Sequence, residues 1–291
     1  MERFAIGDVE IASIIERDGA WRNPLVMYPS AERGLVDEHL RGLPDFVYDA
    51  ARDLLVITYQ TFVLRTPRHT VLIDTCVGQD KPNRGAWLDY PKQPWLDGFA
   101  ALGLKFEDID YVFCTHLHVD HCGWNTRLVD GRWVPTFPNA KYVFGRREYD
   151  FWAAESEKGA DPPGDVWRDS CLPVVEAGQA LLVDDDYALD DSIWLTSTPG
   201  HTPGHVCVNL RSNGQRAVFT GDLMHHALQC REPDWHSCFC WDAAMGNRSR
   251  RTILESVTDT DTLVVPCHFP GTTAGRVVSD GGRFDYRFRG A

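Results

Sequence analysis

The sequence predicts an α/β sandwich, because strand and helix signals alternate through both halves of its 291 residues. Short apolar, β-branched stretches indicate the strands, and stretches with apolar residues on one helical side indicate the helices. The chain shows no internal repeat, low-complexity tract or flexible linker. We therefore expect a single domain over residues 1–291, with an N-terminal extension or lid at about 15–50.

In the first half, the predicted strands are "DVEIASII" (8–15), "LLVITYQTFVLRT" (54–66), "HTVLIDT" (69–75) and "YVFC" (111–114). A helix is expected at "QPWLDGFAALGL" (93–104), where Trp95, Phe99 and Leu102 fall on one side. The stretch "AKYVFGRREYDFWAAES" (140–156) indicates a strand, a turn and a helix.

In the second half, "IWLTSTPG" (193–200) is predicted as a strand that stops at Pro199 and Gly200. "HVCVNLRSNGQRAVFTGD" (205–222) indicates a hairpin with its turn at residues 212–215. "AAMGNRSRRTILESV" (243–257) has helical periodicity, and "DTLVVPCHF" (261–269) predicts a last strand that ends at Pro266.

Composition limits the classes of partner. The formal net charge of −13 disfavours nucleic acid and anionic lipid, and no stretch is apolar for long enough to span a bilayer. The N-terminus lacks the apolar core of a signal peptide, and the nine scattered cysteines are typical of reduced thiols. We therefore expect a cytoplasmic protein that contacts neither nucleic acid nor membrane.

Four groups that bind metals lie within six residues in "THLHVDHCGW": His116, His118, Asp120 and His121. They follow the predicted strand "YVFC". Imidazole and carboxylate suit zinc and similar divalent ions. Ligands spaced one residue apart on an extended segment point to the same side, and a following turn brings the other two back. One such segment supplies ligands for two ions but completes neither coordination shell.

Three further residues able to bind a metal follow predicted strands elsewhere in the chain. His201 follows the strand that stops at Pro199 and Gly200, Asp222 follows "RAVFTG", and His268 follows "DTLVVPC". The repeated order of apolar strand and then ligand is stronger evidence than any one histidine. We expect these residues to complete the metal shells.

These residues resemble the metallo-β-lactamase superfamily of metal-dependent hydrolases, through "THLHVDHCG", "TPGHTPGH", "TGDLMHH" and "VPCHFPG" in that order. The resemblance implies an αββα four-layer sandwich with mixed β-sheets. It implies two divalent ions, zinc in the first place, with iron, manganese or cobalt as alternatives. The implied first metal is held by His116, His118 and His201, the second by Asp120, His121 and His268, and Asp222 bridges them.

The resemblance also implies roles outside the ligand set. Asp74 resembles the family's supporting Asp, and His205 resembles a structural His that does not bind metal. Asp120 is expected to orient the nucleophile and to carry its proton. His225 stands three residues after Asp222, where many lactonases of the family have Tyr, and is expected to donate to the substrate. His226 is an alternative donor, and a structural role for either remains open.

The function expected from these features is hydrolysis of a small ester or lactone by attack of a metal-bridging hydroxide. The layout resembles the N-acyl homoserine lactonase and organophosphate hydrolase-like branch. Two alternatives remain open: a thioester hydrolase of the hydroxyacylglutathione hydrolase type, and a mononuclear iron persulfide dioxygenase.

Aromatic residues are dense between the predicted elements, as in "GAWLDYPKQPW", "EYDFW" and "PDWHSCFCW". Such segments either line an apolar pocket for the acyl or aryl part of a small-molecule substrate or cover the core. The segment at 15–50 is interpreted as a lid or as a subunit contact, and the second reading implies a homodimer.

Overall fold

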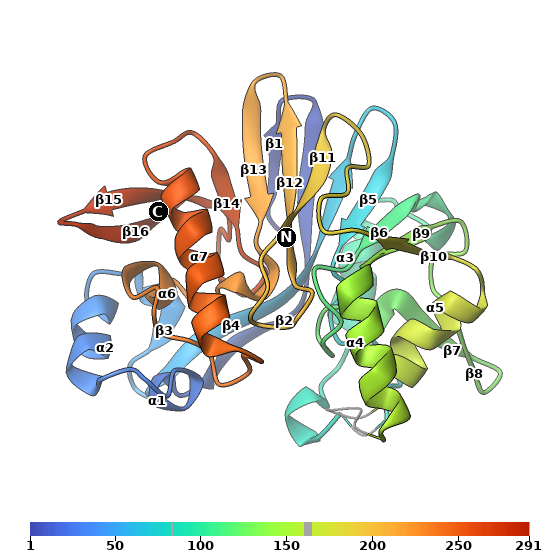
Figure 1. The fold of residues 1–291 in the computed structure, drawn as a ribbon, viewed down its shortest axis with the longest axis horizontal. Coiled ribbons are helices and arrows are strands. Elements are labelled where there is room, and N and C mark those ends of the chain that lie inside the picture. The colour runs from blue at the N-terminus through green and yellow to red at the C-terminus, as the bar shows by residue number, and fades with distance from the viewer. Residues whose placement is uncertain (83, 160–164, 291) are drawn as a thin grey trace. The chain divides into compact units, whose positions relative to one another are not determined.

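The computed structural model describes residues 1–82, 84–159 and 165–290. The chain folds as two compact units. One comprises Met1, residues 3–17 and residues 59–187, and the other comprises Glu2, residues 18–58 and the chain from residue 188 onward. The boundaries after residues 17 and 58 fall inside two long strands, β2 (Val9–Arg22) and β4 (Leu54–Arg65), and the boundary after residue 187 precedes β11 (Ile193–Ser197). The labels of these and later elements are those of Figure 1.

The larger sheet, most of which lies in the first unit, has the strand order β1-β2-β4-β5-β6-β9-β10, and β3 pairs with the part of β4 that belongs to the second unit. Strands β4 and β5 are antiparallel, whereas β5, β6, β9 and β10 run parallel. The carboxyl ends of the parallel strands therefore meet at one edge of the sheet. The other strands are β1 (Arg3–Ile6), β3 (Tyr48–Asp49), β5 (Thr70–Ile73), β6 (Tyr111–Phe113), β9 (Lys141–Gly145) and β10 (Ala180–Val183).

Helices and a small hairpin complete the first unit. Helix α4 packs against β9 and β10, and its Glu148 and Ser156 are buried. The helices are α3 (Gln93–Ala101), α4 (Arg146–Glu157), α5 (Leu172–Glu176), the π-helix Trp167–Cys171 and the 3₁₀ turns Ala86–Leu88, Phe106–Asp108 and Gly123–Asn125. The hairpin pairs β7 (Thr126–Val129) with β8 (Arg132–Pro135).

The sheet of the second unit has the order β11-β12-β13-β14-β15-β16. Strand β12 runs antiparallel to both β11 and β13, and β13 runs parallel to β14. Strands β11, β13 and β14 thus share one direction, and their carboxyl ends lie at one edge. The bounds are β11 (Ile193–Ser197), β12 (Val206–Ser212), β13 (Gln215–Phe219), β14 (Leu263–Val265), β15 (Gly275–Asp280) and β16 (Arg283–Phe288).

Helix α7 (Ala243–Val257) is the longest helix of the second unit within the described residues. The Asp242 side chain caps it by accepting from the Met245 N–H, and Arg250, Ile253, Leu254 and Val257 are buried at helical spacing. Its ribbon is orange in Figure 1, and it packs against β15. The remaining helices are α1 (Pro24–Met27), α2 (Arg33–Leu40), α6 (Leu228–Arg231) and the 3₁₀ turns Asp45–Val47 and Gly221–Leu223.

The predicted α/β class is confirmed, with both larger sheets mixed. The hairpin at 205–222 is confirmed, since Ser212 pairs with Gln215 across a two-residue turn. The predicted helix at 243–257 has those bounds, whereas β9 runs directly into α4 without the expected turn. None of the helices among the described residues has the length and hydropathy needed to cross a membrane.

Residues 18–50 of the N-terminal segment expected as a lid or subunit contact belong to the second unit. The Arg231 guanidinium donates to the carbonyl oxygens of His39 and Gly42, at 2.5 and 2.8 Å. The His39 imidazole lies 2.9 Å from a Glu232 carboxylate oxygen. These contacts anchor α2 and the residues after it against α6.

Candidate metal centre

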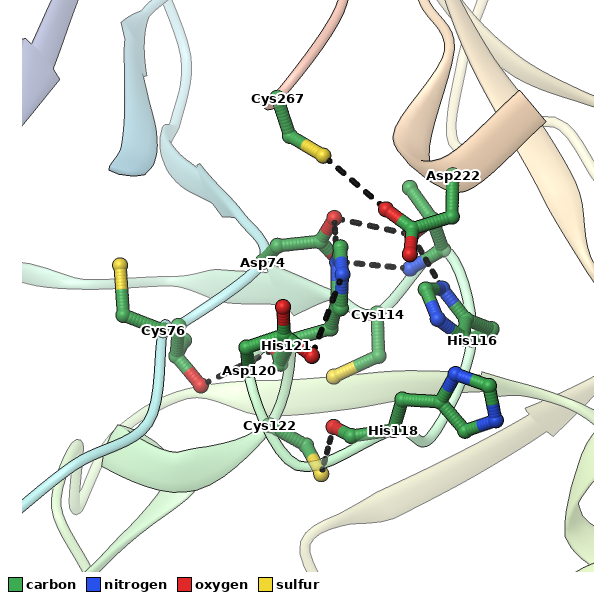
Figure 2. Close-up of polar contacts among 12 residues, drawn as sticks. Asp74, Cys76, Cys114, His116, His118, Asp120, His121, Cys122, Asp222 and Cys267 are labelled. Atoms are coloured by element: carbon green, nitrogen blue, oxygen red, sulfur yellow. Dashed lines mark hydrogen bonds and ion pairs between the residues drawn. The ribbon is translucent and has the colours of Figure 1, made fainter. Parts of the chain in front are cut away.

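The loop after β6 in the first unit gathers the four ligand types of the "HLHVDH" motif. The His116 ring lies 4.6 Å from the His118 ring and 4.0 Å from the His121 ring, centroid to centroid. Asp120 Oδ1 is 3.7 Å from His121 Nε2. Figure 2 shows these side chains on one loop, with Asp74 beside them. The motif therefore concentrates nitrogen and carboxylate donors as a divalent cation requires.

Asp74, at the carboxyl end of β5, orients His121. Its Oδ2 lies 2.8 Å from His121 Nδ1, and its two oxygens also accept from the Thr115 N–H and hydroxyl, both at 2.8 Å. Since a carboxylate only accepts, Nδ1 carries the proton and the lone pair of the neutral ring is on Nε2. This carboxylate–histidine pair is the arrangement that fixes a metal-binding imidazole. The supporting position predicted for Asp74 fits this geometry.

The segment after Asp74 is tied to the end of the ligand loop. The Gly123 N–H donates to the Cys76 carbonyl at 2.8 Å, and the Trp124 N–H donates to the Thr75 carbonyl at 2.9 Å. A Cβ on Gly123 would lie 1.9 Å from the Val77 carbonyl oxygen, so only glycine allows this approach. Cys76 itself adopts a φ of 47°, in the left-handed region that favours glycine.

Glu148 of α4 supports the ligand loop from the neighbouring strand end. Its Oε1 accepts from the backbone N–H of Leu117 at 3.0 Å and from Trp152 Nε1 at 2.7 Å. The Trp152 ring packs edge-on against the His118 ring, with centroids 5.5 Å apart. The carboxylate is buried, with its residue 1% exposed. Sequence reasoning did not identify this residue.

In the second unit, three imidazoles surround the carboxylate of Asp222. His268 Nε2 lies 2.8 Å from Oδ1, whereas His201 Nε2 and His225 Nε2 each lie 3.1 Å from Oδ2. All four residues are buried. His201 and His268 are predicted ligands and Asp222 is the predicted bridge, so the structure brings together all the ligands that the sequence places in this unit.

The proton positions on His268 indicate that this cluster needs a cation. His268 Nδ1 donates to the Thr58 carbonyl at 2.9 Å, so the lone pair of the neutral ring, on Nε2, faces a carboxylate oxygen. Burial opposes a charged His201, but the Asp222 carboxylate outweighs it and raises the pKa of His201 to about 9. Positive charge is thus stabilised among these rings, and a divalent ion supplies it. The donor set fits such an ion.

Helix α7 and a close glycine contact place His201. The Asp242 N–H donates to the Gly200 carbonyl at 2.8 Å, and the Trp241 N–H donates to the His201 carbonyl at 2.9 Å. Gly200 has a φ of 135°, and a Cβ there would lie 2.0 Å from the Gly246 backbone nitrogen. The "TPGH" turn therefore requires glycine before the histidine.

The other histidines near Asp222 have different partners. His205 Nε2 accepts from the Asp222 backbone N–H at 3.1 Å, so its lone pair is used and it positions Asp222, as expected for a residue that does not bind metal. His225 is kept neutral, because burial outweighs Asp222 and lowers its pKa to about 4. His226 Nε2 lies 3.0 Å from the Val47 carbonyl, which indicates a structural bond.

Cys267 is a second residue that sequence reasoning left without a role. Its Sγ lies 3.3 Å from Asp222 Oδ1. Its position next to the predicted ligand His268 could have indicated a role at the metal centre. The apolar strand before Cys267 instead suggested a thiol buried in the core.

Comparison with known proteins gives a family match over most of the chain. Residues 57–268 match the family described as the Metallo-beta-lactamase superfamily. The N-acyl homoserine lactonase AttM of Agrobacterium fabrum is 34% identical over 123 residues, which are 39% of this chain and 40% of that protein. An N-acyl homoserine lactonase of a Bacillus species is 26% identical over 165 residues, 53% of this chain and 58% of that protein. The chain thus spans about half the length of the curated relatives it matches.

Two solved structures share the fold along nearly the whole chain. The hydrolase AbOPH, of the beta lactamase superfamily, has a TM-score of 0.81 at 21% identity, covering 98% of this chain and 95% of its own. AidC, a dizinc quorum-quenching lactonase solved with the product N-hexnoyl-L-homoserine, has a TM-score of 0.80 at 20% identity, covering 100% and 97%.

Proposed function

Since the chain belongs to the metallo-β-lactamase superfamily, we propose that it is a dinuclear metal-dependent hydrolase that cleaves a small ester or lactone. The first metal would be held by His116, His118 and His201, and the second by Asp120, His121 and His268. Asp222 would contribute its carboxylate to both. The observation that carries this proposal is that the two predicted ligands His201 and His268 place imidazole nitrogens 3.1 and 2.8 Å from the Asp222 carboxylate.

Two bound divalent ions supply the chemistry of such a hydrolase, because they polarise a carbonyl and lower the pKa of water to near neutrality. The residues of the chain bind, orient and exchange protons around them. Asp120 orients the attacking water and takes up its proton. Burial lowers the pKa of His225 to about 4, so its ring is neutral at pH 7 and carries one N–H. We assign this N–H to the substrate oxygen once Asp222 coordinates the metals.

The small-ester or lactone class is supported by the curated relatives, which are named N-acyl homoserine lactonases. The Phe239 side chain is 42% exposed, and its ring centroid lies 6.3 Å from that of His225. Phe239 therefore offers apolar surface beside the proposed donor. We assign the apolar acyl or aryl part of the substrate to this surface.

The test measures metal content and hydrolysis together. Wild-type protein should bind two zinc ions per chain and hydrolyse aryl esters or lactones, with activity lost to a chelator and restored by zinc. Asp222→Asn should lose at least one ion and lower hydrolysis by about 100-fold or more. Asp234→Asn, an exposed carboxylate paired with Arg251 at 3.0 Å, is the matched control. Two tightly bound ions in Asp222→Asn would contradict the bridge, and one iron per chain with sulfur-dependent oxygen uptake would favour the dioxygenase.

A further inference from the structure

The geometry points to Cys267 as a sulfur ligand of the second metal, beside Asp222 and His268. This inference rests on the proposal that these two residues hold a metal ion. The Cys267 Sγ, the Asp222 carboxylate and a His268 ring nitrogen lie within 4.8 Å of one another. Figure 2 shows the thiol directed at the Asp222 carboxylate.

Backbone conformation explains how two consecutive side chains reach the same carboxylate. On an extended strand, residues 267 and 268 would point to opposite faces. Strand β14 ends at Val265, Pro266 follows, and Cys267 and His268 lie in a turn. The His268 ring is held there by the Thr58 carbonyl at 2.9 Å. Both side chains therefore face Asp222 Oδ1, with Sγ at 3.3 Å and Nε2 at 2.8 Å.

These separations match the distances between two ligand atoms bound to the same metal ion. Zinc binds sulfur at about 2.3 Å and carboxylate oxygen at about 2.0 Å. For bond angles between about 90° and 109°, the sulfur and the oxygen of one zinc lie about 3.0–3.5 Å apart. The observed 3.3 Å between Cys267 Sγ and Asp222 Oδ1 falls within that range. Nitrogen and oxygen ligands at about 2.0 Å each lie about 2.8–3.3 Å apart, which includes the 2.8 Å for His268.

Metal binding at Cys267 would exchange the thiol proton for a bond from sulfur to the ion. The thiol proton that points to Asp222 leaves to solvent when a divalent ion binds, and the sulfur lone pair forms the new bond to the ion. A thiolate is a soft ligand, so it favours zinc and cobalt over the harder manganese. Cys267 would therefore tune which metal this chain retains.

Cobalt replacement tests the ligand without relying on turnover. The full-length protein loaded with Co²⁺ should show a sulfur-to-cobalt charge-transfer band in the near ultraviolet. Cys267→Ser and Cys267→Ala should lose that band and weaken zinc binding by about 10-fold or more in competition with a chromophoric chelator. Cys207→Ser should keep both, because the buried Cys207 contacts Thr198 Oγ1 at 3.5 Å instead.

A second variant separates Cys267 from another nearby thiol. Cys240 Sγ lies 4.0 Å from His201 Nδ1. If Cys240→Ser removes the band and Cys267→Ser keeps it, the inference is overturned. It is equally overturned if folded wild-type protein binds two cobalt ions per chain without any sulfur band, a result that would leave the proposed function standing. A sulfur band without hydrolysis of any ester or lactone would instead contradict only the proposed function, and a failure to bind cobalt or zinc would contradict both.

Discussion

Glu148 accepts a hydrogen bond at 3.0 Å from the backbone N–H of Leu117, the residue between His116 and His118. The same oxygen accepts from Trp152, whose ring packs on His118. One buried carboxylate thus fixes both the backbone and one ring of the ligand loop. Because ligand shells depend on the groups that orient them, Glu148 is a positioning residue of the proposed metal centre.

Glu148→Gln should weaken zinc binding by about 10-fold, because a neutral amide oxygen accepts the Leu117 and Trp152 N–H groups more weakly than a carboxylate oxygen does. Zinc affinity by chelator competition measures this effect. Glu157→Gln, on the exposed side of the same helix, is the control. An unchanged affinity in Glu148→Gln would show that the loop holds its geometry without this carboxylate.

Gly200→Ala should destabilise the protein far more than Gly214→Ala. Both glycines have positive φ, at 135° and 78°, so each alanine carries a backbone cost of about 1 kcal/mol. Only at Gly200 does the new Cβ meet the backbone of Gly246, at 2.0 Å, which adds about 1–3 kcal/mol. Urea unfolding of both variants measures the difference. Equal losses would contradict the close approach of α7 to the "TPGH" turn.

Phe239→Ala should raise KM for esters with long apolar acyl groups and leave KM for acetyl esters nearly unchanged. The lost contact is apolar and close to His225, so it acts on binding of that group. Phe46→Ala is the matched control, since Phe46 is 40% exposed and packs edge-on against Phe288 at 5.1 Å. Identical KM changes across the acyl series would remove Phe239 from substrate binding.

His226 should make the fold sensitive to mild acid. Burial lowers its pKa from 6.5 to about 4, so between these values the unfolded chain binds a proton that the folded chain does not. Stability is therefore complete above about pH 6.5 and falls as the pH drops toward 4, by about 2 kcal/mol between pH 7 and pH 5. In His226→Gln this part of the loss should disappear from urea unfolding curves. His236→Gln, a half-buried histidine, is the control, and an equal pH dependence in His226→Gln and wild type would contradict this account.

The sequence predicts those features that depend on local signals. The hairpin turn at Asn213 and Gly214 and the periodicity of α7 are written in consecutive residues, and the structure has both. The small hairpin of β7 and β8 was not predicted, and neither was the pairing of β15 with β16. These strands are short or polar, so whether they form depends more on pairing with a neighbouring strand than on their own sequence.

The residues of the proposed site likewise fall into those that local sequence identifies and those that only the fold identifies. Ligand types stood out because each follows an apolar strand, and parallel strand directions bring them to one edge within each unit. Glu148 and Cys267 were missed because their roles come from contacts across the fold. A buried glutamate on a helix looks like a surface residue in sequence, and a cysteine after an apolar strand looks like core.

The central claim is that seven side chains hold two divalent ions. A crystal structure of zinc-loaded protein with anomalous scattering at the metal edge tests it most directly. We predict two anomalous peaks, one bound by His116, His118 and His201 and one by Asp120, His121 and His268, with Asp222 coordinating both. A single peak, or two peaks that these seven residues do not hold, would contradict the account, whereas an added bond from Cys267 to the second ion would not.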